Sequence, residues 1–472
     1  MSSEDSSTAV DPQTQIQTPD VAASRPTGAV ETLTQIQTPK RVMGGFSATM
    51  IVVASMVGTG VFTTSGFLLE TTPSAPVVLI SWLIGGIIAF FGALSYAELV
   101  SIYPQNGGEY QLLSKIFHPA LGFIAGWISL IVGFSAPIAS AAMAFGEYAS
   151  NTFPELNKFW AAVIVILILS TVHSIRVTLG SAVQNIFTVL KIILVSAFII
   201  GGFVLGDFSL IAKESVSDTT SIIFSPAFAV GLIYITYAYT GWNGSAYIAG
   251  EVKNPTKAVP RALAFGTILV TLIYIGLNTV FLAAAPLSEL TGKVDIGAVA
   301  AIHLFGENIG NIFSAIIAVL LISSISAMIM EGPRIYQSVG DDYPSFHFLS
   351  KRKGDSGPYI AIILQAIIAI LMLMTARFDE LIMYIGFTLS LNSALTVAGV
   401  FVMRKRHPEL ARPYKCWGYP VTPVIFILLS LWMIVFTLIN NPMVALAGGG
   451  TILSGALLYW IAKPRKVRKN EE

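Results

Sequence analysis

Two glycine-containing stretches interrupt otherwise apolar segments, and their composition is typical of helix breaks that bind a small ligand. They are Gly58-Thr59-Gly60 and Thr240-Gly241-Trp242-Asn243-Gly244. Glycine weakens a helix, and unwound backbone inside lipid persists only where its N–H and C=O groups face protein, water or a ligand. For either stretch alone, close helix packing through small residues is the alternative explanation.

The charges at two such breaks are those that a zwitterion needs. The N–H groups at the start of a half-helix attract an anion, and the carbonyl groups of unwound backbone attract a cation. We therefore expect a carboxylate at the N–H groups after Gly58. An ammonium group is expected at the carbonyls before the breaks, in Ser55, Met56 and Val57 and in Tyr237, Ala238 and Tyr239.

Lys191 lies inside an apolar segment and is flanked on both sides by valine, leucine and isoleucine. It stands about eleven residues into its predicted span, roughly 16 Å from the cytoplasmic end. A bare ammonium at that depth is costly, so we expect it to face the bundle interior near the breaks, against Ser323 or Ser324. A structural cation that keeps its proton and a proton-coupling group are both open interpretations.

These groups stand in a chain with the composition of a membrane protein. Of its 472 residues, 54% are hydrophobic and 11% are charged, against about 25% charged in soluble domains, which excludes a soluble globule. Apolar runs of about 20 residues recur, each long enough to cross a hydrocarbon core of about 30 Å. We expect twelve spans, at 44–69, 75–101, 119–149, 158–176, 180–205, 225–250, 262–286, 309–336, 357–375, 379–403, 420–439 and 442–462.

The positions of Lys and Arg predict the orientation of these spans. With the N-terminus in the cytoplasm, 22 of the 27 basic residues are cytoplasmic, Lys191 is in the membrane, and the others are Lys158, Lys213, Lys293 and Arg377. This predicts a multi-pass protein of the cell membrane with both termini in the cytoplasm. The net charge of +1 leaves no basic surface for nucleic acid, and a single cysteine, Cys416, leaves no pair for an internal disulfide.

The two breaks fall in the first span of each of two possible five-span halves, residues 41–205 and residues 225–403. Because five is odd, the second half enters the membrane from the opposite side, as in transporters built from inverted repeats. Two further helices are expected at 420–462, which completes a transporter domain over residues 41–463.

Two terminal segments are expected to lie outside this domain. Residues 1–40 are rich in Ser, Thr, Gln and Pro and are predicted to form a disordered cytoplasmic tail. That tail contains the repeat Thr-Gln-Ile-Gln-Thr-Pro at 14–19 and 34–39. Residues 464–472 are predicted to form a basic cytoplasmic tail. No signal peptide is expected before the first span, which is itself the insertion signal.

Acidic residues near predicted helix ends are expected to be solvated. Glu98, with Tyr96, ends the second span, and Glu331 stands three residues before Arg334 in the eighth, where an ion pair or gate latch is the alternative. The five histidines lack ligand spacing, and no acid, base and metal ligands converge in the membrane. We therefore expect no metal, no cofactor, no catalytic residues and no enzymatic activity.

Five motifs occur in order along the chain. They are Val57-Gly58-Thr59-Gly60-Val61-Phe62; Ser95-Tyr96-Ala97-Glu98-Leu99 with Pro104, Gly107-Gly108 and Tyr110; Tyr237-Ala238-Tyr239-Thr240-Gly241-Trp242-Asn243; Asn254-Pro255 with Pro260-Arg261; and Arg412-Pro413-Tyr414 with Gly418-Tyr419-Pro420. In these motifs, over nearly all of residues 41–463, the chain resembles the amino acid–polyamine–organocation transporters, and among them the L-type amino acid transporters and their prokaryotic relatives.

The resemblance implies an all-α membrane protein with the leucine-transporter fold, whose 5+5 inverted repeat binds substrate between spans one, three, six, eight and ten. It also implies roles for single residues. Gly58, Thr59 and Gly60 would hold the substrate carboxylate, Tyr237 would be an aromatic gate, Thr240 and Gly241 would line the side-chain pocket, and Lys191, against Ser323 or Ser324, would replace sodium.

Three departures from the family pattern accompany the resemblance. Thr59 stands where the family often has Ser, and Glu331-Gly332-Pro333 stands where it often has small polar residues. Heteromeric animal members have an external cysteine, whereas Cys416 is predicted to be cytoplasmic. A disulfide-linked heavy-chain subunit is therefore not expected.

The predicted function is sodium-independent secondary transport of amino acids or related amines by alternating access, as an exchanger or a proton-coupled symporter. A proton/polyamine antiporter of the same fold is one alternative. A channel, or a sensor that binds a ligand without pumping it, is another, and a membrane enzyme is a weaker one. The expected partners are a small-molecule amino acid and the lipid bilayer, and the oligomeric state is open, with a monomer among the possibilities.

Overall fold

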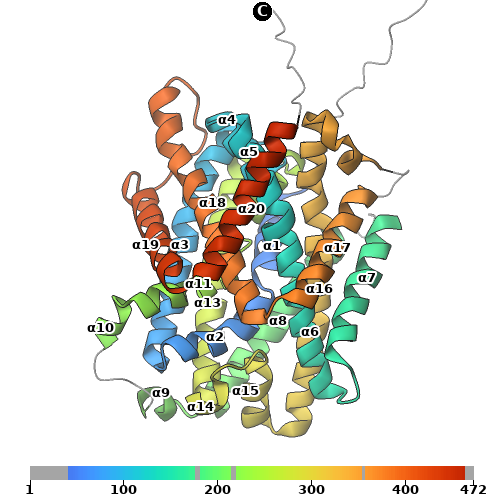
Figure 1. The fold of residues 1–472 in the computed structure, drawn as a ribbon. Helices are drawn as coiled ribbons and strands as arrows, with labels where there is room; N and C mark the ends of the chain where they lie inside the picture. The colour runs from blue at the N-terminus through green and yellow to red at the C-terminus, as the bar shows by residue number, and fades with distance from the viewer. Residues whose placement is uncertain (1–40, 176–180, 214–218, 353–356, 463–472) are drawn as a thin grey trace, which may run out of the picture. The chain divides into compact units, whose positions relative to one another are not determined.

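The computed structural model describes residues 41–175, 181–213, 219–352 and 357–462, and the named elements in these ranges are all helices (Figure 1). The predicted tails at 1–40 and 464–472, with the N-terminal repeat, lie outside the described residues. The elements are α1 (Gly45–Met56), α2 (Thr59–Thr71), α3 (Ala75–Ile102), α4 (Gly108–Ile116), α5 (Pro119–Ile128), η1 (Ser129–Ser135), α6 (Ala136–Thr152), α7 (Lys158–Ile175), α8 (Ser181–Leu205), α9 (Ser209–Lys213), α10 (Thr219–Ile223), α11 (Pro226–Tyr239), α12 (Gly244–Tyr247), η2 (Ala249–Glu251), α13 (Pro255–Ala284), α14 (Leu287–Leu290), α15 (Ile296–Phe305), α16 (Glu307–Asp342), η3 (Pro344–Ser350), α17 (Tyr359–Thr375), α18 (Phe378–Arg406), α19 (Val421–Asn440) and α20 (Pro442–Ile461).

Ten helical segments in the described residues are long and apolar enough to cross a membrane. This confirms the prediction of an all-helical, multi-pass membrane protein. Two of these segments combine elements, because α1 with α2 and α5 with η1 and α6 each form one segment. At the predicted sixth and ninth spans, α11 has 14 residues and α17 has 17, so the number twelve stays a prediction.

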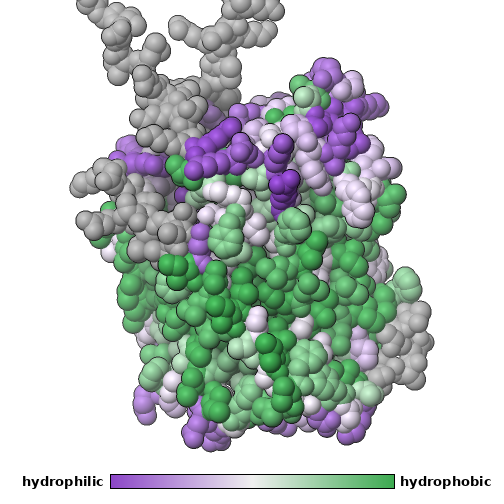
Figure 2. All heavy atoms as spheres, turned by 180° about the vertical axis from the view of Figure 1, so that it is seen from behind, coloured by the Kyte–Doolittle hydropathy of each residue, from purple (hydrophilic) through white to green (hydrophobic). Residues whose placement is uncertain are grey.

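The outer surface of the bundle carries the apolar side chains that lipid requires. Figure 2 shows a broad band of hydrophobic residues between more hydrophilic residues at two ends. Large apolar side chains are exposed on several helices, for example Trp160 on α7, Leu272 on α13 and Trp460 on α20. Such a surface is stable in a bilayer and is a liability in water.

Short helices that the sequence did not predict lie at the two ends of the bundle (Figure 1). One end of the bundle, which we call the α4 end, contains α4. The opposite end, which we call the α15 end, contains α9, α14 and α15.

Aromatic packing at the centre fixes the end of α11. Trp82 of α3, Tyr239 of α11 and Tyr274 of α13 are buried with ring centroids 5.0 to 5.9 Å apart. The Tyr239 hydroxyl also donates to the Trp82 carbonyl at 2.8 Å. Three helices are thereby locked together one residue before the second predicted break.

The third predicted span contains a π-helical segment, η1, between α5 and α6. Its hydrogen bonding is shifted by one residue, so that the N–H of Ala136 bonds to the carbonyl of Ile131. The Ser135 hydroxyl donates to the Leu130 carbonyl at 2.7 Å and satisfies an acceptor inside the segment. Such segments are often found at functional sites.

Candidate functional site

The first predicted break is present, and it begins one residue earlier than the glycine pattern indicated. α1 ends at Met56, Val57 and Gly58 are not helical, and α2 begins at Thr59. Thr59 therefore stands in the first turn of α2, where backbone N–H groups lack partners within the helix. These are the donors that a carboxylate would use.

The second break is longer. α11 ends at Tyr239, the backbone from Thr240 to Asn243 forms turns, and only the four-residue α12 follows. Gly241 has a φ of 94°, in the left-handed region that favours glycine. The sixth predicted span is therefore a half-helix followed by irregular backbone rather than two comparable half-helices.

Glycine residues allow the backbone at one break to pack directly against the backbone of the helix that leads into the other break. A Cβ added at Gly241 would lie 2.6 Å from the carbonyl carbon and oxygen of Ser55, and one added at Gly60 would lie 2.3 Å from the Cα of Ala238. No larger residue fits at either crossing without moving the backbone. Glycine is thus used here for close approach of two chains, and at Gly241 for the positive φ as well.

Tyr274 of α13 joins the two helix ends. Its hydroxyl lies 2.5 Å from the Met56 carbonyl and 3.0 Å from the Ala238 carbonyl. Both carbonyls come just before a break, and the side chain is buried. One hydroxyl proton is therefore shared between two acceptors that sequence analysis assigned to the ligand.

Lys191 of α8 is 2% exposed and extends to the first break. Its Nζ donates to the Val57 carbonyl at 2.7 Å and to the Ser324 hydroxyl of α16 at 2.9 Å. The structure thus brings Lys191 and Ser324 together, and the contact does not include Ser323. A carbonyl and a hydroxyl compensate part of the cost of placing an ammonium at this depth.

A cavity lies beside the two breaks and contains about 930 Å³ of empty space, part of it open to solvent. Of the predicted ligand residues, Ser55, Thr240 and Gly241 line it. The other predicted residues, Met56, Val57, Gly58, Thr59, Gly60, Tyr237 and Ala238, are not part of its lining. Residues from α3, η1, α16, α18 and α19 complete the walls.

Tyr237 lies outside the cavity and is hydrogen-bonded to another helix. Its hydroxyl is 2.8 Å from the Ser140 hydroxyl of α6. On the α15 side of the breaks, the Tyr148 hydroxyl donates to the Phe62 carbonyl at 2.7 Å and accepts from the Gly297 N–H at 3.1 Å. These hydrogen bonds hold α2 against α6 and α15. The cavity lies toward α4 instead, because Glu109 of α4 is part of its lining.

Two acidic residues of the cavity were not predicted as site residues. Glu331 of α16 is 6% exposed, and its Oε2 accepts from the Ser55 hydroxyl at 3.4 Å. The expected solvated position is therefore wrong. Of the alternatives, the ion pair within 4 Å is formed by Arg334 with Glu251 at 3.5 Å, and Arg334 acts on Glu331 only at longer range. The gate latch stays a prediction. α16 continues to Asp342, so Glu331 lies well inside the helix rather than at its end.

Glu109 of α4 is the second acidic residue of the cavity. Its Oε1 accepts from the Tyr96 hydroxyl at 3.0 Å and from the Asn243 side-chain amide at 2.5 Å. Burial raises the pKa of Glu109 above its usual range, because the low-polarity surroundings disfavour the charged form. Asn243 belongs to the second break, and its side-chain amide donates to this carboxylate. It therefore connects the break to Glu109.

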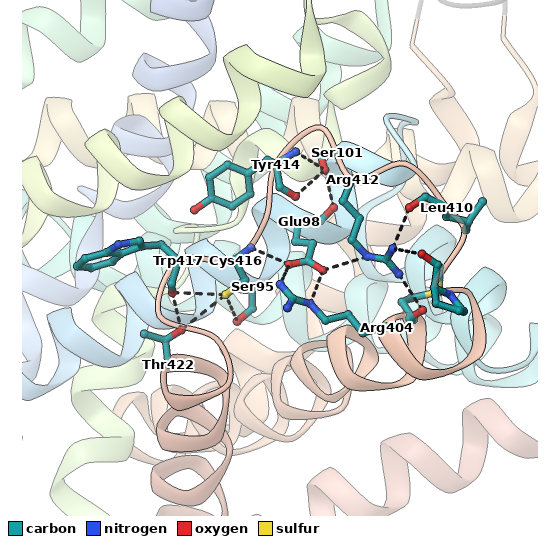
Figure 3. Close-up of polar contacts among 12 residues, drawn as sticks. Ser95, Glu98, Ser101, Arg404, Leu410, Arg412, Tyr414, Cys416, Trp417 and Thr422 are labelled. Carbon is teal, nitrogen blue, oxygen red and sulfur yellow. Dashed lines mark hydrogen bonds and ion pairs between the residues drawn. The ribbon is translucent and has the colours of Figure 1, made fainter.

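Glu98 was also expected to be solvated, and it is fully buried (Figure 3). Arg404 donates to its two oxygens at 2.9 and 2.6 Å, the Cys416 N–H donates at 2.6 Å, and Arg412 lies at 3.5 Å. This cluster, which we call the Glu98 cluster, joins the end of α3 to the end of α18 and to the segment that leads into α19. The prediction that Glu98 is solvated was wrong because its partners cannot be recognised from the neighbouring sequence. Both arginines lie about 300 residues away in the chain, and Arg404 is 306 residues from Glu98.

Comparisons with known proteins agree with this architecture. Residues 43–462 match the family described as amino acid permease. The chain is 29% identical over 436 residues to the serine/threonine exchanger SteT of Bacillus subtilis (strain 168), a match that covers 90% of this chain and 98% of that protein. It is 30% identical over 452 residues to the b(0,+)-type amino acid transporter 1 of Homo sapiens, covering 90% of each. It is 28% identical over 446 residues to the large neutral amino acids transporter small subunit 2 of Mus musculus, covering 90% and 82%. All three are named as transporters or exchangers, and none as an enzyme.

Proposed function

This chain belongs to the amino acid permease family of the amino acid–polyamine–organocation superfamily, and on that premise we propose that it is a sodium-independent transporter of amino acids or closely related amines. It works by alternating access, as an exchanger or a proton-coupled symporter. The names of the three relatives have amino acid transport or exchange in common. The preference for particular substrate side chains depends on the residues of the cavity.

The observation that carries this proposal is the contact of the two breaks at Ser55 and Gly241 beside a cavity. Unwound backbone at two crossing helices offers N–H groups and carbonyls in one place. The substrate carboxylate then binds at the N–H groups of Thr59 and Gly60, and its ammonium binds at the Thr240 and Ser55 carbonyls. Binding requires these groups to turn toward the cavity, which the motion between the two states of the carrier supplies.

The position of Lys191 supports the proposal of sodium independence. Its ammonium binds a backbone carbonyl of the first break and a hydroxyl of α16, and both are oxygen ligands of the kind that a sodium ion takes. With a resident cation at this position, a second one is repelled. Loss and return of the Lys191 proton would provide the coupling in a proton symporter.

The twelve-span arrangement and the orientation belong to the same proposal. We assign α1 to α8 to the first repeat, at residues 41–205, and α11 to α18 to the second repeat, at residues 225–403, in a leucine-transporter fold followed by α19 and α20. With the α4 end in the cytoplasm of the cell, the cavity lies on the cytoplasmic side. Tyr237, bonded to Ser140, then belongs to the closed side of the pathway.

Counterflow in proteoliposomes tests the proposal. Purified protein is reconstituted, loaded with unlabelled amino acids, and assayed for uptake of labelled amino acid with sodium, without sodium, and with a pH gradient. We expect accumulation that is independent of sodium. Lys191→Met is expected to abolish it, while Lys158→Met, which changes an exposed lysine paired with Glu147, retains it.

Two results would contradict the proposal. Uptake that requires sodium would remove the assigned role of Lys191. Binding of amino acids without counterflow would identify a sensor of the same fold instead of a transporter.

A further inference from the structure

The cavity holds two carboxylates that form no ion pair within the described part of the chain. Glu331 is 6% exposed and Glu109 is 2% exposed, and both line the cavity. The ion pairs of the described residues include neither of them. Burying an ionised carboxylate without a compensating charge is costly, so a reason for keeping two of them here is required.

Glu331 has one oxygen that nothing in the described protein satisfies. Its Oε2 receives only the Ser55 hydroxyl at 3.4 Å, and its Oε1 has no hydrogen-bond partner there. The nearby Arg334, one helical turn away, forms its ion pair with Glu251 and acts on Glu331 only at longer range. Lys191 binds Ser324, seven residues back along α16, which is about 10 Å of helix. In the described residues, the free oxygen therefore has no cation within ion-pair distance.

Glu109 repeats this pattern on another wall of the same cavity. The hydrogen bonds from Tyr96 and Asn243 both reach Oε1, and the Tyr247 hydroxyl interacts with the same carboxyl. All three groups are uncharged. Its Oε2 has no hydrogen-bond partner in the described structure. The cavity thus contains two incompletely satisfied acids among uncharged hydroxyl and amide side chains.

We propose that Glu331 binds a positively charged group on the substrate side chain, so that the transporter accepts amino acids with a cationic side chain, such as an ammonium or a guanidinium. This rests on the proposed function, because the breaks hold the zwitterionic end and place the side chain toward Ser55 and Glu331. An ammonium or guanidinium donates to Oε1 and supplies the missing charge. Glu109 contributes a second acidic side chain to the same cavity.

L-Lysine and L-norleucine test this inference, because norleucine is lysine without its side-chain amine. Their apparent affinities are measured by thermal shift of the full-length protein in detergent and by counterflow in proteoliposomes. We expect wild type to prefer lysine over norleucine by about tenfold or more, as one charge-assisted hydrogen bond allows. In Glu331→Gln we expect the preference to be lost, because the apparent affinity for lysine falls to that for norleucine. Glu307→Gln, an exposed acid on the same helix, is the matched control and keeps the preference.

The outcomes separate this inference from the function beneath it. If neutral amino acids exchange and lysine does not, or if Glu331→Gln keeps the preference for lysine, the inference is wrong and the transport function stands. If Glu331→Gln changes only the response to a pH gradient, Glu331 carries a proton and the inference is wrong in that way. If no amino acid of either kind exchanges, the proposed function fails, and the inference fails with it.

Discussion

The Glu98 cluster and the Glu331 side chain are two buried carboxylate regions of one bundle, and they differ in how their charge is balanced. Glu98 has two arginines and a backbone N–H around it, so that both oxygens have strong donors (Figure 3). Within the described residues, Glu331 accepts one long hydrogen bond, from the Ser55 hydroxyl at 3.4 Å. Glu98 lies outside the lining of the cavity, whereas Glu331 is part of it.

The difference separates two uses of a buried charge. Where oppositely charged side chains of the protein surround a buried carboxylate, the ion pairs hold helix ends together. The carboxylate oxygens are then not available to a ligand. Where the charge is unmatched, the folded protein carries a cost that a ligand can remove.

The largest effect is expected at the matched carboxylate. Glu98→Gln leaves the partly exposed Arg404 and Arg412 against a neutral group. Breaking a fully buried pair costs about 3–5 kcal/mol, which is the upper bound here. We expect a large fall in the thermal unfolding temperature of the purified protein and a fall in expression.

Glu331→Gln is the matched comparison, because the chemical change is identical and Glu331 forms no ion pair within 4 Å in the described part of the chain. We expect its unfolding temperature to equal or exceed that of wild type. Equal destabilisation by the two substitutions would remove the distinction drawn between the two regions.

The next effect is expected at the crossing of the breaks. Gly241→Ala places a Cβ 2.6 Å from the Ser55 carbonyl at a φ of 94°, and backbone strain of this kind costs about 1–3 kcal/mol. Counterflow should be lost while the protein still folds in detergent. Gly449→Ala on α20, where a Cβ meets open space, should transport as wild type does. Full activity of Gly241→Ala would show that the contact of the breaks is not needed.

A smaller effect is expected from the shared hydroxyl. Tyr274→Phe removes the donor to the Met56 and Ala238 carbonyls, at a cost of about 1 kcal/mol for one hydrogen bond. Freed carbonyls beside the breaks should alter the apparent substrate affinity. Tyr384→Phe removes a comparable hydroxyl that is bonded to Thr451, and it should lower stability without changing affinity. Equal changes in affinity for the two variants would assign Tyr274 a purely structural role.

The smallest effect concerns Glu109 and pH. Because burial raises its pKa above 4.5, the folded protein keeps a proton in a pH window where the unfolded chain has lost it. Stability from this group is therefore present below the window and decreases as pH rises through the folded pKa. We expect Glu109→Gln and wild type to unfold at similar temperatures at the acidic end, and the variant to gain relative to wild type as pH rises. A constant difference across pH would contradict this.

The sequence was most informative at residues whose type is compatible with few positions inside a membrane. Gly58 and Gly241 indicated the breaks because unwound backbone in lipid requires a reason, and Lys191 indicated an interior position because lipid excludes its charge. Charged residues near predicted helix ends were misjudged for the converse reason. Glu331 and Arg334 look like the end of a span, yet α16 continues to Asp342 because protein covers it there.

Other features depend on contacts that no local pattern contains. The partners of Glu98 come from the other end of the chain, and the cavity takes Glu109 from a short helix between two spans. The link from Asn243 to Glu109 joins residues 134 positions apart. Pairwise geometry of this kind becomes visible only once the helices are packed.

The π-helical segment η1 allows the third membrane helix to contain one extra residue. Because its wider turn absorbs that residue, deleting a single residue near Gly133 would restore ordinary α-helical pairing and leave α6 at nearly its present angle to α5. Deleting a residue of α6 before Ser140 would instead rotate the side chains that follow by about 100°. Ser140 would then point away from Tyr237, and Tyr148 away from the Phe62 carbonyl. The insertion is thus tolerated only where the helix can widen.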